Sequence, residues 1–150
     1  MDFFGEIEIS EHEAEMFARA LYVVARAEGG VHEREEALIG AFLDDVAGGS
    51  LSLASLARMS SPTAKDVSHA LGGRPELARL FLKTALLLAY VDGNYALEER
   101  KVIVDFAMAL GVNDKDLADL EQAVREYLLG HLVHLKNVDV ARKVAKNLGL

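Results

Sequence analysis

The residues of this chain best suited to chemistry are four carboxylates in two short segments. Glu28 is followed by a glycine and, seven residues on, by Glu35; Asp92 is followed by a glycine and, seven residues on, by Glu99. Hard divalent cations bind where several carboxylate oxygens converge from short turns. If both segments lie at one end of the fold, these four carboxylates form a candidate cation site, with His32 as a further ligand in the first segment.

The same carboxylates also have a purely structural interpretation. A glutamate in the first turn of a helix interacts favourably with the helix dipole, by about 0.3–1 kcal/mol, and Asp92 before a glycine is a good turn former. The spacing resembles an EF-hand loop, but the first two ligand positions would be Leu88 and Tyr90 in the second segment, and Val24 and Arg26 in the first. None of these is a carboxylate, which excludes an EF-hand. The sequence alone favours the structural interpretation and leaves the cation site open.

Other candidate sites have weaker support. His131 and His134 are three residues apart and would share one side of a helix, but no second pair of transition-metal ligands is evident nearby. The segment that begins at His12 starts like a zinc-protease motif, with Met16 where the second histidine must be. The chain has no cysteine, nucleophile elbow, phosphate-binding loop or dinucleotide-binding glycine motif. We therefore do not expect an enzyme.

Composition limits the classes of partner. The chain has 150 residues, enough for one domain with a buried core, and a net charge of −8, which disfavours nucleic acid. Residues 131–150 carry +3 and the remainder −11. This basic tail would contact an anionic membrane, a partner or, as we favour, its own bundle. The N-terminus is acidic and the longest apolar stretch, 80–91, contains a lysine, so we expect no targeting or spanning segment and a cytoplasmic protein.

Helical periodicity dominates the chain, and no stretch alternates for long as a strand does. Helix-start signals are frequent: Ser10 with Glu13 has capping-box spacing, Ser61 precedes Pro62 as an N-cap, and Pro75 opens a longer helix. The expected helices are one after Ser10, one over 33–46, two short helices within 51–71, one from Pro75 to the turn at Asp92, one closed by Gly111, one capped by Asn113 and a helical tail after Gly130. The predicted fold class is all-α, a compact bundle of about seven helices.

An internal repeat organises these helices. When the sequence is shifted by 64 residues, two helical hairpins overlay, with Ala25 on Ala89, Glu28 on Asp92, Gly29 on Gly93, Glu35 on Glu99, Ile39 on Ile103 and Phe42 on Phe106. Neither hairpin can bury its apolar stripe alone, so the two should pack on each other with pseudo-twofold symmetry. We expect one domain over 1–150, with repeat one at about 11–47, a middle segment at 48–73, repeat two at about 75–111 and C-terminal helices over 113–150.

The two hairpins resemble a known family. The second hairpin is similar to the second-repeat signature of TerB-like tellurite-resistance proteins over residues 89–95, 98–100 and 106–112. The first hairpin resembles the first repeat of that family over residues 25–29 and 35–36. Length and helix order agree over nearly the whole chain. Glu28 stands where aspartate is usual, and Ala96 and Leu97 where acids or a proline are common.

The resemblance implies a bundle of two similar halves, the fold of the N-terminal domain of a membrane-anchored DnaJ-type co-chaperone. It also implies a non-catalytic role in tellurite and other stress resistance, alongside calcium-binding partners at the inner membrane face. In this family the acidic turns are associated with divalent cations. The alternative is a metal-free protein–protein interaction module, either co-chaperone-like or an adaptor at the inner membrane face.

Overall fold

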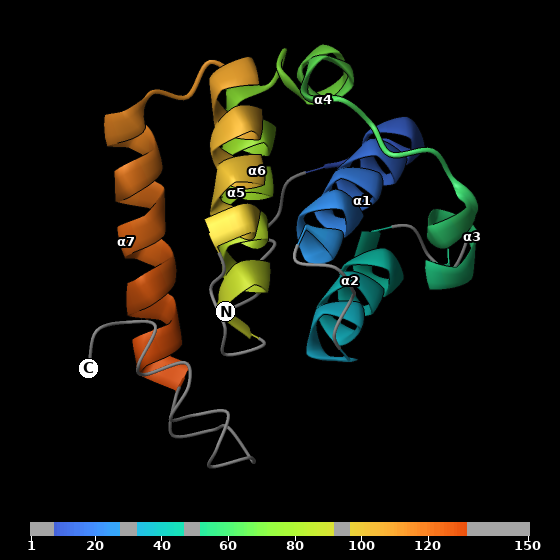
Figure 1. Cartoon of the computed structure of the whole chain (residues 1–150), viewed down its shortest axis with the longest axis horizontal. Helices are drawn as coiled ribbons and strands as arrows, with labels where there is room; N and C mark the ends of the chain where they lie inside the picture. The colour runs from blue at the N-terminus through green and yellow to red at the C-terminus, as the bar shows by residue number, and fades with distance from the viewer. Residues whose placement is uncertain (1–7, 28–32, 47–51, 92–96, 132–150) are drawn as a thin grey trace.

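The computed structural model describes residues 8–27, 33–46, 52–91 and 97–131. Within these ranges the chain forms seven α-helices and no strand, so the predicted all-α bundle is confirmed (Figure 1). The helices are α1 (Glu11–Arg26), α2 (Glu33–Val46), α3 (Leu53–Arg58), α4 (Ala64–Leu71), α5 (Pro75–Val91), α6 (Leu97–Ala109) and α7 (Asp114–His131). None of these helices is long and apolar enough to cross a membrane.

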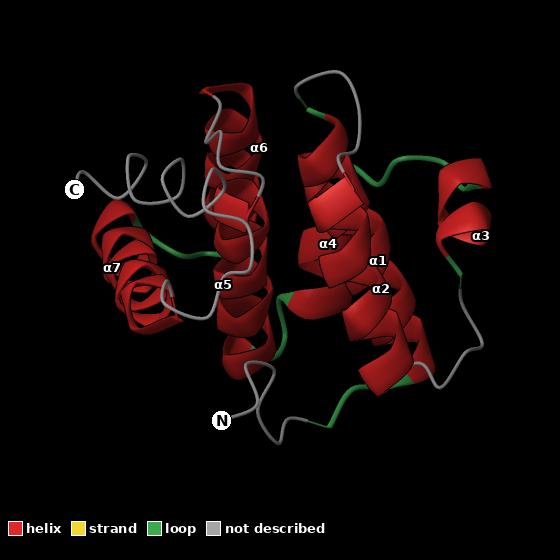
Figure 2. Cartoon of the chain, turned by 90° about the horizontal axis from the view of Figure 1, so that it is seen from below, coloured by secondary structure: helices red, strands yellow, loops and turns green. Residues whose placement is uncertain are grey.

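Two hairpins, α1–α2 and α5–α6, make the centre of the bundle. Helix α1 packs on α5, and the contacts between hairpins are reciprocal, because α1 also meets α6 while α2 meets α5. Helix α7 packs on α5, and α3 lies against α1 and α2 on the opposite side of the molecule (Figures 1 and 2). The short helix α4 contacts α1, α5 and α6 and so joins the two halves at one end.

The helix boundaries follow the 64-residue repeat. Helix α1 shifted by 64 residues covers 75–90, and α5 covers 75–91; α2 shifted in the same way covers 97–110, and α6 covers 97–109. Equivalent residues are buried alike: Ala25 and Ala89 are 1% and 0% exposed, and Ile39 and Ile103 are 0% and 1% exposed. The two hairpins are therefore equivalent in structure as well as in sequence.

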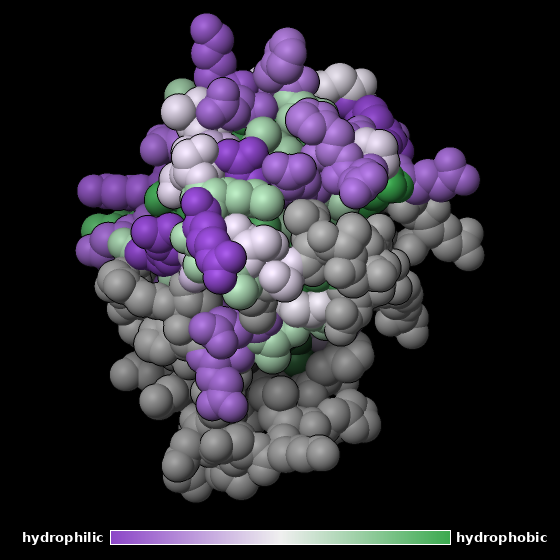
Figure 3. Space-filling view, turned by 90° about the vertical axis from the view of Figure 1, so that its right-hand side faces the viewer, coloured by the Kyte–Doolittle hydropathy of each residue, from purple (hydrophilic) through white to green (hydrophobic). Residues whose placement is uncertain are grey.

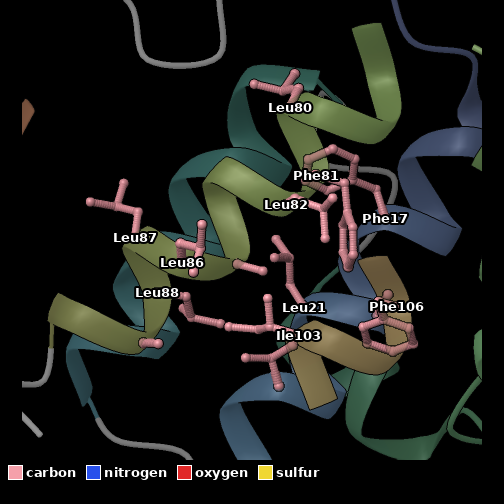
Figure 4. Packing of buried hydrophobic residues seen from close by; sticks show 14 of the residues in the cluster. Phe17, Leu21, Leu80, Phe81, Leu82, Leu86, Leu87, Leu88, Ile103 and Phe106 are labelled. Atoms are coloured by element: carbon pink, nitrogen blue, oxygen red, sulfur yellow. The ribbon is translucent and has the colours of Figure 1, made fainter. Parts of the chain in front are cut away.

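Four phenylalanines link the two hairpins through the core. Phe17 stacks on Phe42 with ring centroids 4.3 Å apart, and Phe81 meets Phe106 edge-on at 5.6 Å. Phe17 and Phe81, which are 64 residues apart, meet each other edge-on at 5.3 Å (Figure 4). A contact between equivalent residues is what a twofold relation produces at its axis, so this pair lies where the two halves meet.

Local capping chemistry sets most helix ends. The Ser10 hydroxyl accepts a hydrogen bond from the Glu13 amide at 3.1 Å, and the Ser10 amide donates to the Glu13 carboxylate at 3.0 Å, which confirms the predicted capping box. Gly111 has φ +77°, as expected of the residue that closes α6. Asn113 Oδ1 accepts from the Asp116 amide at 2.8 Å and caps α7.

One predicted helix start is wrong. The N-cap of α4 is Thr63 rather than Ser61, and Pro62 precedes the helix instead of lying in its first turn. The reason is a second capping box. Thr63 Oγ1 accepts from the Asp66 amide at 3.1 Å, while the Thr63 amide donates to the Asp66 carboxylate at 2.9 Å. Two reciprocal hydrogen bonds outweigh the favourable placement of proline in a first turn.

One face of the molecule shows how polar side chains cover the bundle. On the side of the molecule that carries α3, the described surface is mainly hydrophilic, with small hydrophobic areas between (Figure 3). This division matches the amphipathic pattern from which the helices were predicted. The predicted helical tail and the basic residues within 132–150 lie outside the described residues.

Candidate functional site

Two of the predicted cation ligands are deeply buried. Glu35 and Glu99 are each 1% exposed, and each lies in the first turn of the second helix of its hairpin. Their helix neighbours Glu36 and Glu98 are exposed. The repeat therefore places one carboxylate in the protein interior at the same position of each half.

Helical spacing explains this burial. Glu35 precedes the buried residues Ile39 and Phe42 by four and seven positions, so all three share the inward face of α2. Glu99 has the same relation to Ile103 and Phe106 on α6. This spacing was available in the sequence, but both glutamates were considered only as first-turn residues and not as members of the inward face.

A buried carboxylate needs compensation, because the loss of its hydration costs several kcal/mol. The first turn of a helix supplies part of it, since its backbone N–H groups have no partner within the helix and the dipole is positive there. Glu35 and Glu99 create this same requirement at equivalent positions, in the first turns of α2 and α6.

The remaining predicted ligands, Glu28, His32 and Asp92, lie outside the described residues, as does His134. In the part of the chain that the structure describes, no group of three or more acidic or histidine side chains is arranged to hold a metal ion. Of the predicted set, the structure therefore gives a position to Glu35 and Glu99 alone.

A buried tyrosine lies at the end of α5, close in sequence to the second acidic segment. Tyr90 is 2% exposed, and burial is the main reason that the pKa of its phenol is raised above 10.0. The charge of Glu121 on α7 raises it further, while Arg125 acts in the opposite direction. Tyr90 thus stays neutral at physiological pH and adds no charge at the end of α5.

Comparisons with protein-family models, with curated proteins and with solved structures found no match.

Proposed function

We propose that this chain is a non-catalytic, TerB-like stress-response protein that binds a divalent cation through its two acidic helix–turn–helix segments. Glu35 and Glu99 supply the inner carboxylates, and Glu28, Asp92 and His32 are the further candidate ligands. The observation that carries the proposal is the burial of Glu35 and Glu99, each 1% exposed, at equivalent positions of the two repeats. A divalent cation at each turn, or one shared between them, offsets the cost of holding these charges away from water.

A second candidate function is a metal-free protein-interaction module, and a feature of α6 favours it. Leu97 and Met108 are 65% and 71% exposed, unusual values for large apolar side chains. They are eleven residues apart on one helix, close to three full turns, so they lie on the same side of α6. Contact with a partner through this side of α6 leaves Glu35 and Glu99 uninvolved, because both are too deeply buried to meet another protein.

Ion binding to the full chain separates the two functions. We expect Ca²⁺, Mg²⁺, Mn²⁺ or Zn²⁺ at about 100 times its Kd to stabilise the protein by about 2.7 kcal/mol, measured as a rise in Tm, with heat of binding in calorimetry. Glu35→Gln and Glu99→Gln keep the side-chain volume and remove one negative charge each. Both variants should lose most of the rise in Tm that the ion produces.

The chain provides a matched control for each variant. Glu36→Gln and Glu98→Gln change the same charge one residue away, on exposed side chains, and should keep the full response to the ion. A wild-type Tm that millimolar ions leave unchanged would rule out the cation function. The cation function is also ruled out if each of Glu35→Gln and Glu99→Gln loses the same stability relative to wild type with the ion as without it. The carboxylates would then stabilise the turns only.

A further inference from the structure

A cleft of about 440 Å³ lies between α1 and α4, and none of its lining residues belongs to the helices that carry Glu35 and Glu99. Helix α1 contributes His12, Met16 and Arg19, which share one face at spacings of four and three residues. Helix α4 contributes Lys65, Asp66, His69 and Ala70. The volume is in the range of small-molecule sites, roughly 300–1,000 Å³.

Arg19 is a fixed cation at this cleft. Its Nη2 donates to the carbonyl oxygen of Ser60 at 2.8 Å and to the Ser60 hydroxyl at 3.2 Å, so the loop before α4 holds the guanidinium in place. The Arg19 side chain is only 19% exposed, and Glu15 approaches it at 3.6 Å. The Nε–H of Arg19 is buried with no hydrogen-bond partner among the described residues. One N–H group of Arg19 is therefore unsatisfied within the described part of the chain, although its two terminal nitrogens have partners.

The carboxylate of Asp66 is already engaged. It accepts a hydrogen bond from the Thr63 amide at 2.9 Å, and this bond is the main reason that the pKa of Asp66 is lowered; Arg19 and Lys65 lower it further by their charge. Lys65 is exposed and forms no ion pair within the described ranges. The residues that line the cleft thus include two cationic side chains and one committed carboxylate. Because Glu15 pairs with Arg19 beside the cleft, Lys65 is the cation left without an ion pair within the described ranges.

We propose that this cleft binds a small organic anion, a molecule with a carboxylate or phosphate group beside a short apolar group. The anionic group pairs with Lys65, and the nearby charge of Arg19 attracts it further. His12 and His69 add ring nitrogens that donate or accept hydrogen bonds. Met16 and Ala70 supply the apolar surface between the two helices. The site is independent of the proposed cation function, because it uses none of the same residues.

The test is an NMR titration of the full chain with phenyl phosphate, with phenylacetate and with neutral benzyl alcohol. We expect saturable shifts for the two anions in the signals of His12, Met16, His69 and Ala70, and no comparable response to benzyl alcohol. Whichever anion saturates at the lower concentration identifies the preferred charged group. Added salt should weaken both, since the charges lie near the surface.

Two lysine variants make the test specific. Lys65→Gln removes one charge from an exposed side chain without disturbing the core, and should weaken anion binding about five-fold or more. Lys115→Gln removes the same charge from exposed Lys115 on α7 and should leave the affinity unchanged. The proposal fails if neither anion gives a saturable shift at about 10 mM, a concentration far above that of a useful site. It also fails if benzyl alcohol binds as well as the anions, or if both lysine variants lose affinity equally.

Discussion

At the scale of single residues, the carboxylates of the described chain are of two kinds. Glu35 and Glu99 are buried in the bundle, whereas Glu13 lies partly exposed at the start of α1. Glu13 accepts from the Ser10 amide and from Arg74 Nη1, 2.9 Å away on the segment that leads into α5. This one side chain therefore caps α1 and ties it to the start of the second repeat.

Glu13 gives a pH prediction. Its pKa is lowered, first by the hydrogen bond from the Ser10 backbone and then, against the opposing effect of burial, by the Ser10 side chain and Arg74. A carboxyl group whose pKa is lower in the folded state stabilises the fold above its unfolded pKa of 4.5, and this contribution is lost as the pH falls through the folded value. Glu13→Gln should therefore cost about 1 kcal/mol at pH 7. The difference from wild type should shrink towards pH 3.

Urea unfolding at pH 7 and pH 3 measures this difference. Glu11→Gln changes the same charge in the same first turn, on an exposed side chain with no role in the capping box, and is the matched control. A deficit in Glu13→Gln that stayed the same at both pH values would show that its packing, and not its charge, matters.

At the scale of elements, the hydrogen bonds at the end of a helix determine where it stops and how the chain continues. After α6, the Gly111 amide donates to the Met108 carbonyl at 3.1 Å and the Val112 amide to the Ala107 carbonyl at 2.9 Å. This pair of bonds is the Schellman motif, which needs its C′ residue in the left-handed region. Gly111, at φ +77°, provides that conformation and sets the direction in which the chain enters α7.

Gly111→Ala tests this cap. A side chain at positive φ costs about 1–2 kcal/mol, so the free energy of unfolding should fall by that amount in denaturant titrations. Gly73→Ala is the control, because no atom lies within 4 Å of an added Cβ there and its φ is not positive. That variant should be neutral or more stable by up to about 1 kcal/mol, since alanine restricts the unfolded chain. Equal losses in both variants would contradict the role given to Gly111.

At the scale of the whole molecule, the contact between Phe17 and Phe81 joins the two halves. Each of these rings also packs against the phenylalanine of its own hairpin, stacked in the first repeat and edge-on in the second. The two hairpins thus match in their helix bounds and differ in the geometry of these ring pairs. A substitution of either ring therefore alters the packing of both hairpins.

A double-mutant cycle measures the coupling across the pseudo-twofold axis. Phe17→Leu and Phe81→Leu should each cost about 1–1.5 kcal/mol, and the pair should show a coupling energy of about 0.5–1.5 kcal/mol. A control cycle combines Phe17→Leu with Val124→Ala, a buried residue of α7, which packs on α5. That pair should be additive within about 0.5 kcal/mol. If the Phe17–Phe81 pair were equally additive, the two rings would not couple the hairpins.

The fold was largely predictable because the repeat and the capping residues are local signals. Phe42 with Phe106 revealed the 64-residue offset, and the same offset relates Phe17 to Phe81, although that pair was not among the residues from which the repeat was inferred. A shared offset says which residues are equivalent, but it does not say which of them touch. That contact depends on how α1 crosses α5, which is a property of the packed bundle.

The candidate sites were less predictable, for a related physical reason. The spacing identified Glu35 and Glu99, yet their burial follows from the partner helices that cover the inward faces of α2 and α6. The cleft beside Arg19 forms between two helices that are some fifty residues apart in the chain, so no local sequence pattern indicates it. The start of α4 at Thr63 was missed because two overlapping cap signals compete there, and reciprocal bonding decides between them.

The equivalence of the two hairpins, whose helix bounds match, also has a consequence for the order of events during synthesis. At roughly 5–20 residues per second, the ribosome completes the first hairpin about 3–13 s before the matching residues of the second emerge. Through that interval the apolar face of α1 lacks α5, on which it packs in the finished bundle. The repeat equivalent of that α5 surface is the same face of α1 on a neighbouring nascent chain. The self-complementarity that closes the finished bundle is, for those seconds, a route to pairing between chains.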